Sequence, residues 1–218
     1  MIRVYKDPDE PKSLAAHKSY SSDDVVRQLR ADQRGKCYLC ERLTVTDFQV
    51  EHHKSQVQHP DLVYCWNNLF LSCAYCNNKK SNLFDNMVSP TGNDIETHIE
   101  QRLDFDKSKA IFKYIGGENI TDEYGETISF LERVFNGTNK LRTEREQLFY
   151  NYVLSAVNTF QKMVVDWLFA PTAELEDAIR QSLDIGKEFL GFKYWIIKSN
   201  SMLLKHFGDC IKWNREFV

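Results

Sequence analysis

The sequence predicts an α+β fold: a small module of two strands and a helix, held by four cysteines, within a mainly helical chain. Three observations support this prediction. Two C-x-x-C pairs, CYLC and CAYC, enclose segments with strand character. A polar stretch suited to a short helix follows the second pair. From Glu126 onward, apolar residues recur at helical spacing, so the C-terminal region is predicted to be mainly helical.

The bulk composition suits one compact domain with an appended region. The chain has 218 residues, of which 42% are hydrophobic and 13% aromatic, enough to bury a core. We expect three segments. Residues 1–35 form an extended N-terminal segment and a helix, residues 36–85 form the cysteine-bearing module, and residues 86–218 form a mainly helical region that supports the module and binds a partner.

The charge pattern restricts how the chain binds a polyanion. The net charge is −3, so nucleic acid would have to bind a local patch or a partner. Residues 1–85 carry 12 Lys and Arg against 11 Asp and Glu, and are the better place for such a patch. The N-terminus has no apolar signal-peptide core, and no stretch is long enough to span a membrane. We therefore expect the cytoplasm, where disulfides are rare.

The N-terminal half is predicted to contain one capped helix and the strand–strand–helix unit. Ser22 can cap a helix that ends at Gly35. Strand character runs through residues 43–53, where the alternation is imperfect, and again through residues 69–72. The polar stretch after the second cysteine pair, up to Asn82, is suited to a short helix.

The C-terminal half is predicted to begin with a loop over residues 83–97 and two short strands. The strands, LDFD and AIFKYI, flank a Lys/Ser turn. Four helices follow: one that ends at Gly137, one capped by Thr138 with apolar residues from 149 to 168, one capped by Thr172 after Pro171, and a last one over about residues 194–213.

The four paired cysteines indicate a structural zinc site. Two C-x-x-C turns supply four thiolates, the usual tetrahedral set for zinc. The alternative is four unrelated buried cysteines, but these seldom occur as two such pairs. The 32 residues between the pairs exceed a simple zinc ribbon and imply a functional insert. Cys65 and Cys210 are expected to pack in apolar surroundings. The expected zinc ligands are Cys37, Cys40, Cys73 and Cys76.

The insert and the residues after it carry the groups that a metal-dependent phosphodiesterase needs. Glu51 and Asn77 can offer oxygen ligands to Mg²⁺ or Mn²⁺. A neutral histidine can take the proton from a water that attacks phosphorus, and the ion can stabilise the leaving oxygen. Lysines nearby suit nucleic-acid phosphates, and the candidates are Lys54, Lys79 and Lys80.

The run CYLC–VEHH–NNLFLSCAYCNNKKSN resembles the zinc-bearing branch of the HNH endonuclease family. The resemblance covers about 45 residues, roughly a fifth of the chain. It implies a ββα-metal fold and an endonuclease that hydrolyses nucleic-acid phosphodiester bonds. It also implies a role for each matched position: Glu51 and Asn77 as ligands of the catalytic ion, His52 as the general base, Asn68 as the brace of the hairpin loop, Lys80 as the family's basic residue, and the four cysteines as zinc ligands.

The chain departs from the family pattern in two places. Many members have Pro three residues after the histidine, where this chain has Ser55. Many also have a Gly-Gly loop, where this chain has VQHPDLVYC. We therefore expect the loop between the strands to adopt its own conformation.

The whole chain is also similar to the PtuB family, the HNH nucleases of the Septu antiphage systems, which occur beside some retrons. This similarity implies an effector nuclease of an antiphage defence complex, with a PtuA-like SMC-type ATPase as partner. Dense apolar residues in the helical region predict the partner interface there, with an ordinary helical core as the alternative. These residues are Phe149, Tyr150, Tyr152, Phe160, Trp167, Leu168, Phe169, Phe189, Phe192, Tyr194, Trp195, Ile196 and Ile197.

Several alternatives stay open at this point. In a regular strand Glu51 and His53 would share a face, whereas the resemblance favours His52 as the base and implies a distorted strand end. Arg27, Arg30 and Arg34 either follow a phosphate backbone or form a solvated face. DNA is the substrate expected from the resemblance, and RNA, including tRNA, stays open. The alternative function is a zinc-stabilised nucleic-acid-binding or adaptor module without cleavage.

Overall fold

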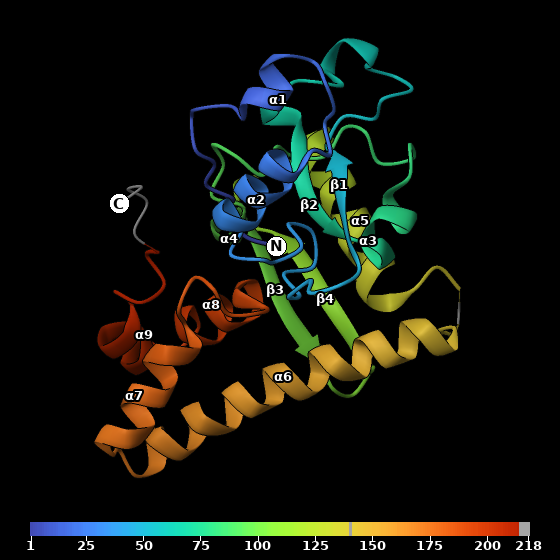
Figure 1. Ribbon diagram of the computed structural model, residues 1–218. Helices are drawn as coiled ribbons and strands as arrows, with labels where there is room; N and C mark the ends of the chain where they lie inside the picture. Colours follow the sequence, from blue (N-terminus) through green and yellow to red (C-terminus); the bar gives the residue numbers. More distant parts are fainter. Residues whose placement is uncertain (140, 214–218) are drawn as a thin grey trace.

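The computed structural model describes residues 1–139 and 141–213 and has mixed helix and strand, as predicted (Figure 1). No described helix combines the length and apolar character needed to cross a membrane. The elements, in order, are α1 Lys12–Ala15, α2 Asp23–Asp32, β1 Phe48–His52, β2 Leu69–Cys73, α3 Ala74–Lys80, α4 Ile95–His98, β3 Ile99–Asp104, β4 Lys109–Tyr114, α5 Asp122–Asn136, α6 Glu144–Phe169, α7 Ala173–Ser182, α8 Leu190–Lys198 and α9 Ser201–Phe207, with single 3-10 turns at Pro60–Leu62 and Trp66–Asn68.

Strands β1 and β2 form an antiparallel hairpin, and α3 follows β2 directly (Figure 1). The register runs from Phe48 opposite Cys73 to His52 opposite Leu69. Strand β1 begins five residues later than the predicted segment 43–53, because Leu43 instead forms an isolated bridge with Lys36 across the first cysteine turn. The predicted order of strand, strand and helix is therefore correct, with a shorter first strand.

The backbone of β2 is also bound on the side away from β1. The buried side chain of Gln33, just after α2, donates to the Leu71 carbonyl at 2.8 Å and accepts from the Leu71 N–H at 2.7 Å. The N–H of Tyr38 donates to the same carbonyl at 3.1 Å. The hairpin is thus fixed to α2 and to the first cysteine turn at the middle of its second strand.

The N-terminal segment predicted to be extended contains the short helix α1. Before that helix, Lys6 fastens the chain to the turn before β2. The Lys6 ammonium donates to the carbonyls of Trp66 and, at 2.7 Å, Leu69. It also lies 3.5 Å from the centre of the Trp66 ring and 4.7 Å from that of Phe70. The Trp66 indole N–H donates back to the carbonyl of Asp7 at 2.8 Å. The Lys6 side chain and the Asp7 carbonyl therefore both bind the turn at residues 66–69.

One hydrophobic core joins all three predicted segments. It contains Met1 and Val4 from the N-terminus, Phe70 from β2, and residues of β3, β4, α5, α6 and α8, among them Phe130 and Phe192. The long helix α6 passes below the β3–β4 hairpin, and α7–α9 gather at its far end around a second apolar cluster (Figure 1). Buried side chains on both sides of residues 35 and 85 pack together in this core. The division into three segments at these two residues stays a prediction.

In the C-terminal half, two of the predicted helices have other boundaries in the structure. Helix α6 is capped by Thr143 and not by Thr138, because the Thr143 and Glu146 side chains bond each other's backbone N–H in a capping box. The predicted last helix is two helices, α8 and α9, because the Asn200 side chain accepts from the N–H groups of Met202 and Leu203 and starts a new helix there. The predicted cap at Thr172 is confirmed, since its side chain accepts from Leu175.

Most of the apolar residues expected at a partner interface lie in the core. Phe149, Tyr150, Phe160, Trp167, Phe189, Phe192, Tyr194 and Ile197 are buried within the chain. Exposed members are few: Phe169 is 87% exposed and Tyr152 is 45% exposed. The burial of these side chains favours the alternative of an ordinary helical core for them, and the partner interface stays a prediction.

Candidate active site beside a four-cysteine metal centre

The four paired cysteines converge, as predicted. Their sulfur atoms all lie within 4.8 Å of one another, and all four residues are buried. Cys40 Sγ and Cys73 Sγ are 3.9 Å apart. Tetrahedral zinc with Zn–S bonds of about 2.3 Å separates its sulfurs by about 3.8 Å, so the cluster fits such an ion. We conclude that Cys37, Cys40, Cys73 and Cys76 can bind a metal such as zinc.

Local structure explains how the sequence assembles this cluster. The first pair lies on a tight turn, closed by hydrogen bonds from Cys37 N to the Arg42 carbonyl and from Glu41 N to the Cys37 carbonyl, both 2.9 Å. The second pair lies where β2 ends, with Cys73 as the N-cap of α3 and Cys76 in its first turn. The cluster therefore joins the first turn to the strand–helix junction.

Glu51 faces α3 from β1 and is held by two buried partners. One carboxylate oxygen lies 2.8 Å from the Lys80 ammonium at the end of α3. The other accepts a hydrogen bond from the Tyr38 hydroxyl in the first cysteine turn. Burial raises the pKa of Glu51, and the Lys80 charge opposes that rise. Both oxygens are engaged, and the residue is only 4% exposed.

Glu51, one of the two residues expected to bind a catalytic Mg²⁺ or Mn²⁺, does not fit such an ion in this arrangement. A hard divalent ion needs open carboxylate oxygens and room for several waters. Both Glu51 oxygens are taken by Lys80 and Tyr38. The other residue, Asn77, donates from its amide nitrogen to Gln49 at 2.6 Å, and this contact does not involve the amide oxygen that would bind an ion. Among residues 1–139 and 141–213, the four cysteines form the only cluster of three or more His, Cys, Asp or Glu side chains that could hold an ion.

His52 has the geometry of an oriented general base. Its Nε2 lies 3.0 Å from the Val63 carbonyl, which can only accept, so Nε2 carries the proton. Its Nδ1 lies 3.0 Å from the amide nitrogen of Gln56, a donor, so Nδ1 bears the lone pair. Burial lowers the pKa of His52 and favours the neutral form. The Tyr20 ring packs edge-on against the imidazole at 4.7 Å.

The neighbouring His53 is a buried packing residue. The register of β1 is regular up to His52, and His53 lies in the bend that follows. Its ring lies 6.3 Å from that of Tyr38, which bonds Glu51. Its Nε2 lies 3.1 Å from the Met87 carbonyl, and burial lowers its pKa to about 4. The Met87 carbonyl therefore occupies one ring nitrogen of His53, which is buried to the same extent as His52.

Asn68 braces the loop between the strands, in the position that the resemblance implies. Its amide nitrogen donates to the carbonyls of Lys54 at 3.0 Å and Leu62 at 3.2 Å. Its oxygen accepts from the Lys54 N–H at 2.7 Å. These bonds close the base of the loop that carries both Gln56 and Val63, the two partners of the His52 ring. The Asn68 side chain therefore fixes the loop from which Gln56 and Val63 contact the His52 ring.

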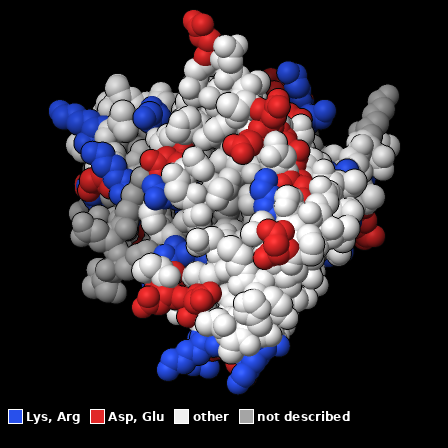
Figure 2. Space-filling view, turned by 90° about the horizontal axis from the view of Figure 1, so that it is seen from above, with Lys and Arg blue, Asp and Glu red and all other residues white. Residues whose placement is uncertain are grey.

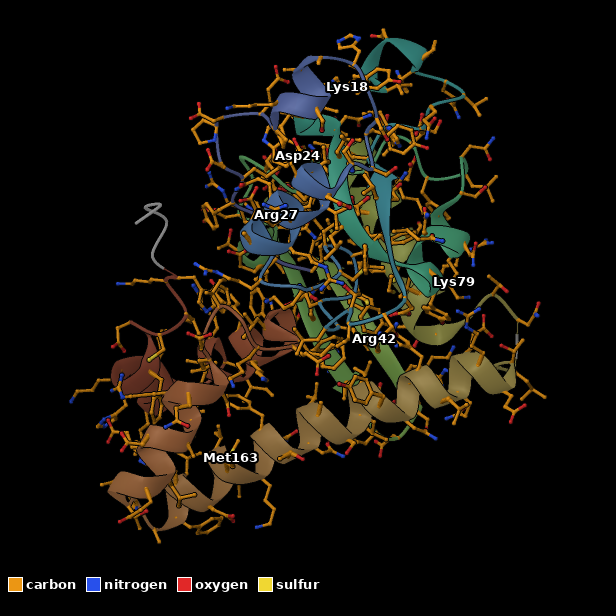
Figure 3. All side chains as sticks on the ribbon, viewed as in Figure 1. Lys18, Asp24, Arg27, Arg42, Lys79 and Met163 are labelled. Carbon is orange, nitrogen blue, oxygen red and sulfur yellow. The ribbon has the colours of Figure 1, made fainter. Side chains whose placement is uncertain are left out.

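The three lysines expected to contact phosphate are all engaged within the protein. Lys80 has no exposed surface, so that expectation is wrong for it: its ammonium lies between Glu51 and the His52 carbonyl. Lys79 points towards α6, where it pairs with Glu146 at 2.5 Å (Figure 3). Lys54 donates to the Asp85 carbonyl at 2.8 Å.

The sequence reasoning missed three residues of this site. Tyr38 bonds Glu51, Gln56 bonds His52, and Asp85 holds the start of the loop. The Asp85 carboxylate accepts from Ser55 N at 2.5 Å and lies 3.0 Å from Nε2 of His59. No signal in the sequence assigned Gln56 or Asp85, because their partners are set by loop geometry. Tyr38 stands inside the CYLC motif, whose spacing assigns a role only to the cysteines.

Charges on the face above the hairpin loop are mixed in sign. In Figure 2, Lys and Arg atoms alternate with Asp and Glu atoms on the visible face. The side chain of Arg30 is bound to the protein, since it donates to the Val45 carbonyl at 3.0 Å and lies over the Phe48 ring. Arg30 therefore contacts the protein itself, and the choice between a phosphate contact and a solvated face stays open for this set of arginines.

Comparison of the chain with protein-family models, with curated proteins and with solved structures found no match. The class that fold and site define directly is an α+β protein with a buried four-cysteine centre that can bind a metal such as zinc.

Proposed function

We propose that the chain is an HNH-type endonuclease that hydrolyses nucleic-acid phosphodiester bonds, with His52 as the general base. The observation that carries the proposal is the His52 ring, with its proton directed to the Val63 carbonyl and its lone pair at Nδ1 beside the exposed Gln56. A backbone carbonyl on one ring nitrogen fixes the tautomer and leaves the other nitrogen to accept a proton. The order of hairpin, helix and cysteine turns adds support through the family resemblance.

The chemistry assigned to the protein's own residues is a single proton transfer with its orientation. Water replaces the Gln56 amide at Nδ1 of His52, which takes a proton as the water oxygen bonds to phosphorus. The P–O bond to the leaving sugar oxygen breaks, and that oxygen takes a proton from solvent. The positive charge that develops on the imidazole is stabilised through Nε2–H by the Val63 carbonyl, 3.0 Å away. Asn68 holds the loop that carries both ring partners. No step is assigned to a divalent ion, because both Glu51 oxygens are engaged by Lys80 and Tyr38.

The preferred substrate is DNA, on the basis of the resemblance, with RNA, including tRNA, as an outcome of the test. The mixed charges and the net charge of −3 favour weak capture by the chain alone. A partner that delivers the substrate therefore belongs to the proposal. The PtuB resemblance suggests an SMC-type ATPase of the PtuA kind within an antiphage complex, and co-purification of the chain with the product of its genomic neighbour tests this.

One observation favours the second candidate, a zinc-stabilised nucleic-acid-binding or adaptor module. The carboxylate that would serve an ion is buried and paired with Lys80. A binding module needs the thiolate centre and the hairpin but no base. The two functions differ in one respect: the endonuclease needs His52 for cleavage, whereas the binding module does not.

Cleavage of plasmid DNA and of tRNA, with Mg²⁺, with Mn²⁺ and with EDTA, tests the proposal. His52→Ala should lower the cleavage rate by about 10²–10⁴-fold while binding and fold persist, since that is the usual cost of losing a general base. His59→Ala is the matched control, because His59 lies in the same loop but contacts Asp85 and not the base. Nucleic-acid binding without cleavage in the wild type would support the binding module instead, and loss of cleavage in His53→Ala alone would reassign the base.

A further inference from the structure

We propose that Lys80 is a positioning residue for His52, and that Glu51 serves as its buried counter-ion and not as a metal ligand. The proposal rests on the proposed function for its kinetic part. Its structural part stands on the contacts of three side chains from three elements: Tyr38 in the first cysteine turn, Glu51 in β1 and Lys80 in α3.

Lys80 connects the end of α3 to the residue that carries the base. Its ammonium lies 2.8 Å from a Glu51 carboxylate oxygen and donates to the main-chain carbonyl of His52 at 3.0 Å. The residue has no exposed surface, so neither bond competes with solvent. In such surroundings a charge-assisted hydrogen bond is strong and its geometry is well defined. The main chain of His52 is thereby fixed to α3.

The imidazole and the main chain of His52 are fixed by different parts of the protein. The ring is held by Val63 and Gln56 in the loop, on the side where Tyr20 packs against it. The carbonyl is held by Lys80 on the side of α3. Losing the second contact frees the strand end to move relative to the loop. A displacement of about 1 Å is enough to cost roughly 10²-fold in rate, because the base must meet its water in a narrow range of positions.

The Glu51 carboxylate is accounted for without an ion. Lys80 takes one oxygen and Tyr38 the other, and all three side chains are buried. A divalent ion at Glu51 would have to displace an ammonium that has no exposed surface. Leaving a buried ammonium unpaired is expensive, because its desolvation is then uncompensated. This competition favours a bracing role for Glu51.

The first experiment compares Lys80→Met with Lys193→Met. Lys193 is the matched control, because it is also a buried lysine whose amine donates to a main-chain carbonyl, that of Ser182 at 3.0 Å, but it lies in α8. Lys80→Met should lower kcat about 10²-fold with KM within about twofold, because substrate binding is untouched. Lys193→Met should leave kcat within about twofold. Equal kcat for the two variants, both folded, would overturn the proposal.

The second readout does not depend on cleavage. Side-chain ¹⁵N shifts of His52 should report one neutral tautomer, protonated at Nε2, in the wild type and in Lys193→Met. They should report mixed tautomers in Lys80→Met, because the ring no longer meets Val63 in one position. If the wild type cuts no nucleic acid but these shifts behave as described, the proposed function fails and the positioning role stands. Identical shifts in all three proteins would reject the positioning role.

A third comparison guards against unfolding and tests the metal. If Lys80→Met fails to fold, the double variant Glu51→Gln/Lys80→Met leaves no buried charge unpaired and should fold with the same loss of kcat and the same mixed tautomers. Mn²⁺ alone, titrated into the wild type and into Glu51→Gln, should bind with the same affinity. Loss of Mn²⁺ binding in Glu51→Gln, or full kcat in the double variant, would return Glu51 to the role of a metal ligand.

Discussion

Replacing Lys6 with methionine should change how the stability of the protein depends on pH. Lys6 holds the N-terminal segment to the turn before β2 through two carbonyls and the face of Trp66. Methionine keeps the length and apolar character of the side chain but carries no proton. Any difference in pH dependence between the two proteins therefore reports the ionisation of this amine.

The magnitude follows from the Lys6 pKa. Burial lowers it from 10.5 to about 7, against an opposing contribution from Asp32. Between those pH values the unfolded chain binds a proton that the folded chain does not, so the free energy of unfolding rises with pH across this window. Below this pH window Lys6 is protonated in both the folded and the unfolded chain. The free energy of unfolding is then lowered by the full cost of burying the ammonium. From pH 7.5 to 9 the rise is at most about 2 kcal/mol, at about 1.4 kcal/mol per pKa unit.

Urea denaturation at several pH values between 7 and 10 measures the effect. The free energy of unfolding of the wild type should climb with pH relative to that of Lys6→Met. An exposed lysine provides the control, and Lys12→Met should run parallel to the wild type. Parallel curves for Lys6→Met and the wild type would refute the reasoning, because they would mean that the two carbonyls and the Trp66 ring keep the amine charged throughout.

Three further predictions concern the metal centre, the loop brace and a helix cap. One zinc per chain should survive dialysis, and Cys37→Ser or Cys76→Ser should unfold the module because site formation and folding are coupled; metal analysis of well-folded protein without zinc would contradict this. Asn68→Ala should lower the free energy of unfolding by about 3 kcal/mol in urea, since buried backbone groups lose their partners, and a loss under about 1 kcal/mol would disagree. Thr143→Ala should cost about 1 kcal/mol, whereas Thr138→Ala should cost nothing measurable by thermal denaturation.

The cysteine cluster and the hairpin were predictable because their signals are local. A C-x-x-C pair specifies a turn within four residues, and two such turns with strand-forming segments between them leave few arrangements. The convergence of Cys37, Cys40, Cys73 and Cys76 confirms this. The roles of His52, Asn68 and Asn77 came from a resemblance and stay predictions, although His52 and Asn68 have contacts that suit those roles.

The helix boundaries in the C-terminal region were less accessible, because more than one residue could start a helix. Thr138 and Thr143 are both possible caps, and the choice depends on Glu146, which bonds back to the Thr143 N–H. The apolar pattern across residues 194–213 hides the break at Asn200. An asparagine inside an apolar run is a weak signal unless its side chain is known to accept from the next turn.

The ion pair of Lys80 with Glu51 could not be predicted from the sequence, for a physical reason. Lysine is almost never fully buried without a partner, so its position after the second cysteine pair indicated a phosphate contact. Its partner, Glu51, lies on a different element and is brought to it only by the packing of α3 on the hairpin. Buried ion pairs between distant residues leave no periodic trace in a sequence, and only the assembled fold reveals them.

The side chain of Gln33 has a consequence for how the protein behaves at high concentration. The outer side of a two-stranded ribbon is an unpaired strand edge, to which a second chain can add. Gln33 offers the Leu71 backbone one acceptor and one donor, as a residue of a third strand would. Its side chain thus occupies the Leu71 backbone groups that another strand would need for pairing. Chains with Gln33→Ala should therefore self-associate through β2 during refolding, while the wild type does not self-associate through this strand.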